Sequence, residues 1–316
     1  MEKKNSSFVV KIDDDRRAKL ERILRSRGWE FGEAPYACWR VTGPGISLVA
    51  YRSGKLTVQG AGAQEFVEFT LEPEVLGALL DAGGGTSMFE NLDRTPHGGI
   101  DESGKGDFFG PLVVAGVFSG GELAEKLAAA GVCDSKMISS DGKIYDLERK
   151  IRALCGDRCA VLLLKNETYN RLYRKIGNLN RLLAWGHARV MENLLCSHPE
   201  CPRMLSDQFA GEDVMRRALL ERGRTVVFEQ HPRAESDVAV AAASILARAA
   251  FIREMARLGE SLGVKLVRGA GPQVRVTAER LVAEHGPEVL ERCSKTHFRT
   301  YLEVMGLPVP EKTPFF

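Results

Sequence analysis

The stretch GGIDESGKGDFFGPL, residues 98–112, is the most informative part of this sequence. Two adjacent acids, Asp101 and Glu102, end a short apolar run, and the turn Gly104–Gly106 follows closely. Carboxylate oxygens are hard ligands of the kind that Mg²⁺ and Mn²⁺ prefer. A glycine-flanked turn lets backbone groups approach a sugar-phosphate closely, and Lys105 can meet a phosphate. The pattern therefore favours a metal site beside a phosphodiester.

The same stretch nearly completes a nucleotide-binding P-loop, through the frame Gly99-x4-Gly104-Lys105. Position 106 is Gly where Mg²⁺ would need a Ser or Thr hydroxyl, and residues 107–111 cannot open a helix. The two acids would also repel the phosphates of a nucleotide. These features argue against a P-loop enzyme.

Two further acids are expected to join this site. Consecutive strand residues face opposite sides of a sheet, so Asp101 and Glu102 share a site only where the strand ends or bulges, which Gly104 would allow. Asp207 closes an apolar strand, where ligands of α/β sheets usually bind. The fourth acid is Glu235 or Asp237; we favour Glu235, because Asp237 also suits the N-cap of a long helix. Such a set fits two-metal phosphodiester hydrolysis.

The chain of 316 residues is long enough for two domains. Residues 81–99 hold five glycines and a proline, which is typical of a linker. We therefore predict an amino-terminal domain over residues 1–82, a linker over 83–96 and a second domain over 97–316 that ends in helices. In the first domain, the patterns predict a small α+β module with strands at 8–12, 38–41, 47–51 and 55–59 and helices at 15–29 and 64–80.

The second domain has the longer alternation of an α/β fold, with a mixed sheet flanked by helices. Strands are predicted at 112–118, 160–165, 203–207 and 225–229. Helices are predicted at 121–130, 141–153, 178–195, 237–258 and 277–284.

Composition indicates a soluble globular protein. The net charge of +2 names no partner, and the sequence shows neither a signal peptide nor a membrane span, so we expect a cytoplasmic protein. Seven cysteines suit reduced thiols better than a disulfide framework. A zinc site is an alternative, but its spacing is loose; it would draw on Cys155, Cys159, Cys196, His198 and Cys201.

Several motifs in order resemble the type 2 ribonucleases H, in their ribonuclease HIII version. The first is residues 101–111, Asp-Glu-Ser-Gly-Lys-Gly-Asp-Phe-Phe-Gly-Pro. It is followed by Asp134-Ser135-Lys136, Asn178-x-Asn180, Leu182–His187, Asp207-Gln208-Phe209, Ala234-Glu235-Ser236, Ala239–Arg248 and Lys295–Phe298. The resemblance covers about residues 97–302. The added amino-terminal domain, which in this family is similar to the TATA-binding protein fold, separates ribonuclease HIII from ribonuclease HII.

The resemblance implies an RNase H-like catalytic fold that cleaves the RNA strand of RNA–DNA hybrids and leaves 5′-phosphate and 3′-hydroxyl ends. It implies two Mg²⁺ or Mn²⁺ ions, with Asp101, Glu102 and Asp207 as ligands and the fourth acid near Glu235. Cutting within runs of ribonucleotides and a monomeric state are expected as well.

Substrate contacts are expected at two places. The turn of Ser103, Gly104, Lys105 and Gly106 would contact 2′-hydroxyls and phosphates, and Lys136 would hold a phosphate. In the amino-terminal domain, the basic helix at 15–29 competes with the sheet face of Lys55, Thr57 and Gln59. We interpret His187 as a packed or partnered core residue and Trp39 and Trp185 as core residues; His297 either approaches the nucleic acid or caps a helix.

Two rival functions remain. A DNA resolvase would share the acids but would not need a turn that reads 2′-hydroxyls. A non-catalytic hybrid-binding protein would be expected to have lost acids that this sequence retains.

Overall fold

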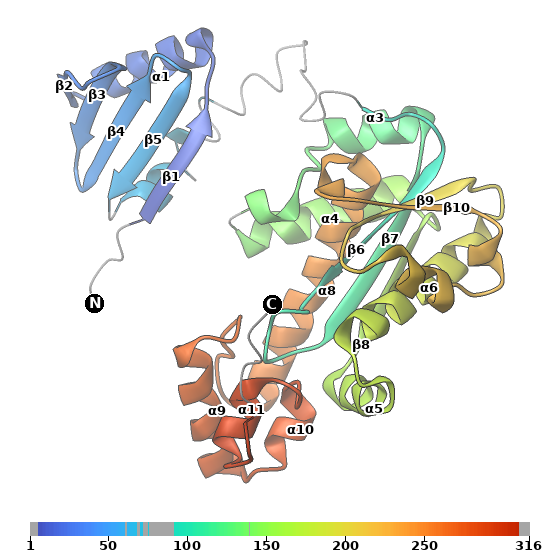
Figure 1. The fold of residues 1–316 in the computed structure, drawn as a ribbon. Helices are drawn as coiled ribbons and strands as arrows, with labels where there is room; N and C mark the ends of the chain where they lie inside the picture. Colours follow the sequence, from blue (N-terminus) through green and yellow to red (C-terminus); the bar gives the residue numbers. More distant parts are fainter. Residues whose placement is uncertain are drawn as a thin grey trace. The chain divides into compact units, whose positions relative to one another are not determined.

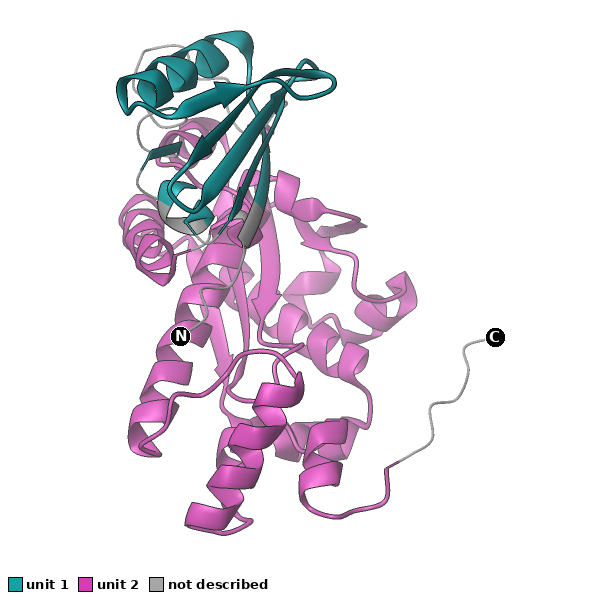
Figure 2. Ribbon diagram, turned by 90° about the vertical axis from the view of Figure 1, so that its left-hand side faces the viewer, with its two compact units in different colours: residues 1–86 teal, residues 87–316 magenta. Residues whose placement is uncertain are grey.

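The computed structural model describes the chain in two compact units, Met1–Thr86 and Ser87–Phe316 (Figure 2). The described residues are 6–60, 62–67, 70–71, 75, 92–138 and 140–309. Residues 83–91 of the predicted linker lie outside them, so the boundaries 1–82, 83–96 and 97–316 stay a prediction.

The amino-terminal unit is built on a five-stranded antiparallel sheet of order β1-β5-β4-β3-β2 (Figure 1). Its described elements are β1 (Ser6–Lys11), α1 (Asp14–Ser26), β2 (Glu30–Gly32), β3 (Ala37–Gly43), β4 (Ile46–Tyr51), β5 (Lys55–Gly60) and α2 (Ala63–Phe66). The predicted α+β architecture is confirmed. The strand β2 was not predicted, because three residues are too few to show alternation. The helix predicted at 64–80 lies mostly outside the described residues.

Alternation along the strands gives this sheet one buried and one solvent face. Leu56 and Val58 of β5 pack with Leu20 and Leu24 of α1 in one core, and Trp39 is buried there as predicted. The intervening side chains of β5 lie on the other face, with Lys55 and Gln59 exposed and Thr57 half-buried.

The second unit is an α/β fold with a mixed five-stranded sheet of order β10-β9-β6-β7-β8, which confirms the predicted class. The central strand β6 pairs antiparallel with β7 and parallel with β9. The strands are β6 (His97–Ser103), β7 (Leu112–Ser119), β8 (Cys159–Leu164), β9 (Arg203–Asp207) and β10 (Val227–His231).

Helices cover both faces of this sheet (Figure 1). All eight residues of β7 are buried: Val113, Ala115 and Val117 pack into the core with α4 and α8, whereas Val114 packs into the core with α6. The helices are α3 (Gly121–Ala129), α4 (Asp141–Cys155), α5 (Asn166–Ile176), α6 (Leu179–Ser197), α7 (Glu212–Ala218), α8 (Val238–Ser261), α9 (Pro272–His285), α10 (Val289–Cys293) and α11 (Arg299–Val304). Short 3₁₀ turns lie at η3 (Ser135–Met137), η4 (Arg222–Arg224) and η5 (Ala234–Ser236).

Some elements differ from the prediction. The strand predicted at 225–229 is β10, two residues later. Helix α5 was missed although Tyr169, Leu172, Tyr173 and Ile176 have helical spacing, because polar residues dominate its sequence. The short helices α7, α10 and α11 were also missed.

The first turn of α8 lies directly against β6. A Cβ atom added to Gly99 would lie 2.2 Å from the backbone nitrogen of Val240 and 2.3 Å from the carbonyl carbon of Ala239. Only glycine permits this approach, which places the start of α8 beside the amino-terminal half of β6.

We predict that Gly99→Ala lowers the free energy of unfolding by about 2–3 kcal/mol or more, because backbone rather than a flexible side chain blocks the new methyl group. Urea unfolding measures the change. Gly142→Ala in α4 is the control, since its added Cβ meets only Oγ of Ser140 at 3.5 Å, an ordinary contact, and it should not lower stability. Equal stability of the two variants would contradict the close approach.

Candidate active site

Asp101 and Glu102 lie near the carboxyl end of β6, and they point to opposite faces of the sheet. Of the two expected alternatives, a strand end or a bulge, the described strand has the first: it ends at Ser103, one residue after Glu102, without a register shift. Asp101 accepts a hydrogen bond from Ser244 of α8. Glu102 faces α6 instead, where its Oε2 lies 2.9 Å from Nε2 of His187. Each acid is therefore held by a different helix.

Two side chains hold the Glu102 carboxylate. Besides His187, the ammonium of Lys105 lies 2.7 Å from Oε1 of Glu102. The interpretation of His187 as a partnered core residue is confirmed, since its side chain is 1% exposed and its partner is this acid. The sequence carried no signal for that partner.

The pKa values of the two acids shift in opposite directions. Burial, with the nearby charge of Glu102, raises the pKa of Asp101 to about 7. Burial would also raise the pKa of Glu102, but the hydrogen bond and charge of His187 and those of Lys105 outweigh it and hold that pKa well below its usual range. Near neutral pH the pair thus carries one firm negative charge on Glu102 and one easily protonated group on Asp101.

Asp207 ends β9, next to β6, as predicted. Its Oδ1 accepts hydrogen bonds from the backbone nitrogens of Arg233 (2.9 Å) and Ala234 (3.4 Å), which ties it to the turn η5. Glu235 lies in that turn and pairs with Lys136 at 2.8 Å. Lys136 also interacts electrostatically with Asp101, so Glu235 and Asp101 share Lys136 as a nearby cation.

Asp237 has a different role. Its Oδ1 accepts hydrogen bonds from the backbone nitrogens of Ala239 and Val240, as the N-cap of α8, and its Oδ2 lies 2.9 Å from Nε2 of the buried His97. Asp93, His97 and Asp237 bring three potential ligand atoms within 4.8 Å of one another, the one such group among the residues that the structure describes.

Each member of that group already has partners. Asp93 pairs with Arg203 and accepts from Thr95, and Nδ1 of His97 lies 2.7 Å from the Thr95 carbonyl oxygen. Burial would lower the pKa of His97, but Asp237 raises it overall, which favours the imidazolium. The group is a structural ion-pair network at the start of α8.

In the predicted substrate turn, Gly104 is fixed by the fold, whereas the tip is exposed. Gly104 is buried with φ +91°, and an added Cβ would lie 2.3 Å from the carbonyl oxygen of Pro111. Lys105 and Gly106 are exposed, and no atom lies within 4 Å of a Cβ added to Gly106. The fold therefore does not require glycine at position 106, whereas close approach of another molecule would.

Other predicted residues lie elsewhere. His297 stacks on Tyr173 with ring centroids 4.0 Å apart, in an aromatic cluster with Tyr169 and Phe298. All seven cysteines are free thiols, and the described structure gathers no zinc-like ligand group around Cys155, Cys159, Cys196, His198 and Cys201. Trp185 is half-buried against the core of α5 and α6.

The acids fit a divalent metal by the chemistry of their donors. Asp101, Glu102, Asp207 and Glu235 all offer hard oxygen ligands. Repulsion between the first two is part of what raises the pKa of Asp101, and a divalent cation would relieve it. Lys105 and Lys136 supply positive charge at the edges of the cluster, where they could meet phosphates.

Comparison with known proteins gives concordant matches. A family model described as Ribonuclease HII matches residues 98–301. Ribonuclease HIII of Chlamydia trachomatis serovar L2 is 41% identical over 303 residues, which cover 95% of this chain and 98% of the relative. The chain belongs to the ribonuclease HIII branch of the type 2 ribonucleases H. It is an enzyme of the ribonuclease H class.

Solved structures of the family agree with this assignment. Bst-RNase HIII in complex with Mn²⁺ aligns with a TM-score of 0.64 and 31% identity, covering 95% of this chain and 98% of that one. RNase H3 of Aquifex aeolicus aligns with a TM-score of 0.52 and 28% identity, covering 91% and 98%. Among the described helices of this family member, none has the length and apolarity to cross a bilayer.

The pKa of Asp101 predicts a pH-dependent gain in stability from its removal. Below about pH 4 the carboxyl is protonated in both folded and unfolded chains; as pH rises toward 7, only the unfolded chain loses the proton, which penalises folding. In metal-free buffer, Asp101→Asn should therefore raise the thermal midpoint by several degrees at pH 8 and little at pH 4.

The matched control is Glu102→Gln, for which the expected change in the thermal midpoint has the opposite sign. Because the folded-state pKa of Glu102 is depressed, its charge stabilises the fold at pH 8, and the variant should melt below wild type there. An equal gain for Asp101→Asn at both pH values would contradict the raised pKa. Calorimetry at the two pH values measures both variants.

Proposed function

We propose that this chain is an endonuclease that hydrolyses the RNA strand of RNA–DNA hybrids and leaves 5′-phosphate and 3′-hydroxyl ends. The observation that carries the proposal is the half-buried acid pair at the end of β6, beside the exposed turn at Lys105 and Gly106. Membership of the ribonuclease HIII family supports the same reaction.

Asp101, Glu102 and Asp207 are the proposed metal ligands, with Glu235 as the fourth acid. Two bound Mg²⁺ or Mn²⁺ ions would supply an activated water and stabilise the leaving 3′ oxygen. His187 holds the Glu102 carboxylate in its ionised form, and the backbone of η5 orients Asp207. These contacts preserve the charge and direction of the ligands. A relative solved with Mn²⁺ supports the choice of ion.

Two surfaces are proposed to bind substrate. In the second unit, the backbone of Ser103, Gly104 and Gly106 would meet 2′-hydroxyls, which distinguish RNA from DNA, while Lys105 and Lys136 hold phosphates. In the amino-terminal unit, either the sheet face of Lys55, Thr57 and Gln59 or the basic helix α1 would bind substrate.

We further propose that the enzyme cuts within runs of ribonucleotides and acts as a cytoplasmic monomer. The alignment with ribonuclease HIII of Chlamydia trachomatis covers 95% of this chain and 98% of the relative, so it includes the amino-terminal sheet domain. This shared domain supports the first point.

The test compares three duplexes with Mg²⁺ and with Mn²⁺: an RNA–DNA hybrid, a DNA duplex with one ribonucleotide, and an all-DNA duplex. We expect cleavage of the hybrid alone, with product ends that a ligase requiring 5′-phosphate accepts. Efficient incision at the single ribonucleotide would contradict the proposed run requirement. Cleavage of all-DNA duplex would indicate a resolvase-like nuclease, and tight hybrid binding without cleavage would overturn the enzyme proposal.

Substitutions of Glu235 and Asp237 should have different effects: the first should lower activity, and the second should lower stability. Glu235→Gln keeps the size of the side chain but removes the proposed ligand charge, so hybrid cleavage should fall by about 100-fold or more while the thermal midpoint stays close to wild type. Asp237→Ala removes the N-cap of α8 and the partner of His97, so the free energy of unfolding should fall by about 1–2 kcal/mol.

Cleavage rates at a temperature where both variants are folded, together with urea unfolding, decide this assignment. Loss of cleavage in Asp237→Asn, which preserves a capping oxygen, combined with full activity of Glu235→Gln would reverse the roles.

A further inference from the structure

The exposed turn at Lys105 and Gly106 rests on a segment that is almost wholly immobilised. Phe108 and Phe109 are 0% exposed and pack edge to face, with ring centroids 4.8 Å apart. Gly110 has φ +81°, and a Cβ there would lie 2.4 Å from Sδ of Met255. The exposed tip at Lys105 and Gly106, which is proposed to meet substrate, is thus followed by a rigid segment, residues 107–110, which we call the base.

This base is bonded on one side to the loop before α9. The backbone nitrogen of Phe108 donates to the carbonyl oxygen of Gly269 at 2.9 Å, and the backbone nitrogen of Gly269 donates to Oδ1 of Asp107 at 2.6 Å. Residues 107 and 108 are therefore fixed by a segment far away in the sequence.

On the other side, the base pairs with the short segment that follows α10. The backbone nitrogen of Lys295 donates to the carbonyl oxygen of Phe108 at 2.8 Å, and that of Gly110 donates to Cys293 at 3.0 Å. An antiparallel bridge joins Phe109 to Ser294.

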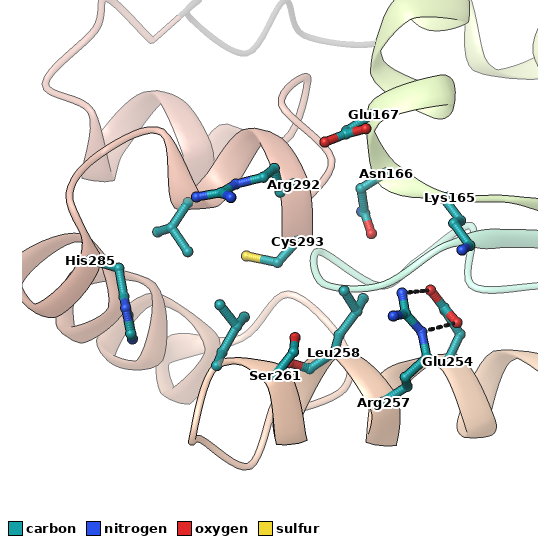
Figure 3. Close-up of a pocket in the computed structure, with 12 residues that line it drawn as sticks. Lys165, Asn166, Glu167, Glu254, Arg257, Leu258, Ser261, His285, Arg292 and Cys293 are labelled. Atoms are coloured by element: carbon teal, nitrogen blue, oxygen red, sulfur yellow. Dashed lines mark hydrogen bonds and ion pairs between the residues drawn. The ribbon is translucent and has the colours of Figure 1, made fainter.

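The Lys295 side chain is the unusual member of this contact. It is 0% exposed, and its ammonium donates to the carbonyl oxygens of Asp107 at 2.8 Å and Gly110 at 2.7 Å. The Gly110 oxygen accepts a second bond, from Nδ2 of Asn166 at the start of α5, at 2.8 Å. Figure 3 shows Asn166 and Cys293 together beside a cavity of about 500 Å³, whose lining includes none of the four acids.

A buried ammonium without a hydrogen-bonded carboxylate is a poor choice for stability. An apolar side chain of similar length would fill the space without the desolvation penalty of the charge. Burial indeed lowers the pKa of Lys295 to about 7, against the opposing effect of Asp107. Unlike an apolar side chain, the ammonium can donate hydrogen bonds to the carbonyl groups of Asp107 and Gly110 at the same time.

We propose that Lys295 is a positioning residue for substrate recognition: by holding the carbonyl groups of Asp107 and Gly110, it fixes where Lys105 and Gly106 meet the hybrid. The inference rests on the proposed function, in which that turn contacts the RNA strand. It assigns the C-terminal helices a role in the site, although they contribute none of its acids. Because misplacement by about 1 Å can reduce a rate about 100-fold, loosening this base should be visible in catalysis.

The test is a double-mutant cycle on kcat/KM for hybrid cleavage. Lys295→Met keeps the length of the side chain and removes the donors, and we expect a loss of about tenfold or more. Lys105→Ala removes the tip cation. If Lys295 acts through the tip, Lys105→Ala should reduce kcat/KM clearly less in the Lys295→Met background than in wild type.

Leu281→Ala is the matched control, since it removes buried contacts of α9 in the same C-terminal helices and leaves in place the described hydrogen bonds that Lys295, Asn166 and Gly269 make to residues 107–110. At a temperature where it is folded, it should keep wild-type kcat/KM, and its effect should be additive with that of Lys105→Ala. Additive losses for Lys295→Met, or a loss of equal size in Leu281→Ala, would overturn the proposal.

Hydrogen exchange in the free protein gives a readout independent of cleavage. The amides of Phe108 and Gly110 should exchange faster in Lys295→Met than in wild type and should be unchanged in Leu281→Ala; unchanged exchange in Lys295→Met would contradict the proposal. If Lys295→Met does not fold, Asn166→Ala, which removes the other donor to Gly110, is subjected to the same cycle and the same exchange test. Failure of the wild type to cleave hybrid would refute the proposed function, while the exchange result would still decide whether Lys295 fixes the turn.

Discussion

Adjacent residues of a β-strand point to opposite faces of the sheet, and the two acids at the centre of this site are adjacent on β6. The fold meets this constraint with two helices. Helix α8 packs against one face, where Ser244 bonds Asp101, and α6 packs against the other, where His187 bonds Glu102. The close contact between β6 and α8 at Gly99, the central position of β6 and the buried strand β7 all serve to hold these two carboxylates at one strand end.

The charge of the cluster follows from the same arrangement. Asp101, buried against an ionised neighbour, keeps its proton more readily, whereas Glu102 has an imidazole and an ammonium to hold its charge. Asp207 and Glu235 come from β9 and η5, and backbone donors and Lys136 orient them. The site thus combines hard oxygen donors with lysines beside them, a distribution that suits the proposed metal-dependent reaction on a phosphodiester.

The sequence was sufficient to predict the α/β class, the strand that ends in Asp207 and the two alternative roles of Asp237, fourth acid or N-cap. Each of these predictions depends on a local pattern. The N-cap role of Asp237 was visible in its position before a long helix, but its pairing with His97, 140 residues away, was not. The same holds for His187 with Glu102 and for Lys295 with the turn at 107–110: each pair meets only after the sheet and helices have packed. Of the strand end or bulge expected near Glu102, the described strand has the end, at Ser103, and His187 provides a partner for Glu102 on the face opposite Asp101.

The central claim is that Asp101 belongs to a divalent-metal site and Asp237 does not. Equilibrium binding of Mn²⁺ to the free protein, followed by electron spin resonance of the unbound ion, tests it directly. The account predicts markedly weaker binding in Asp101→Asn and binding close to wild type in Asp237→Asn, which keeps the capping oxygen. Wild-type affinity in Asp101→Asn would contradict it.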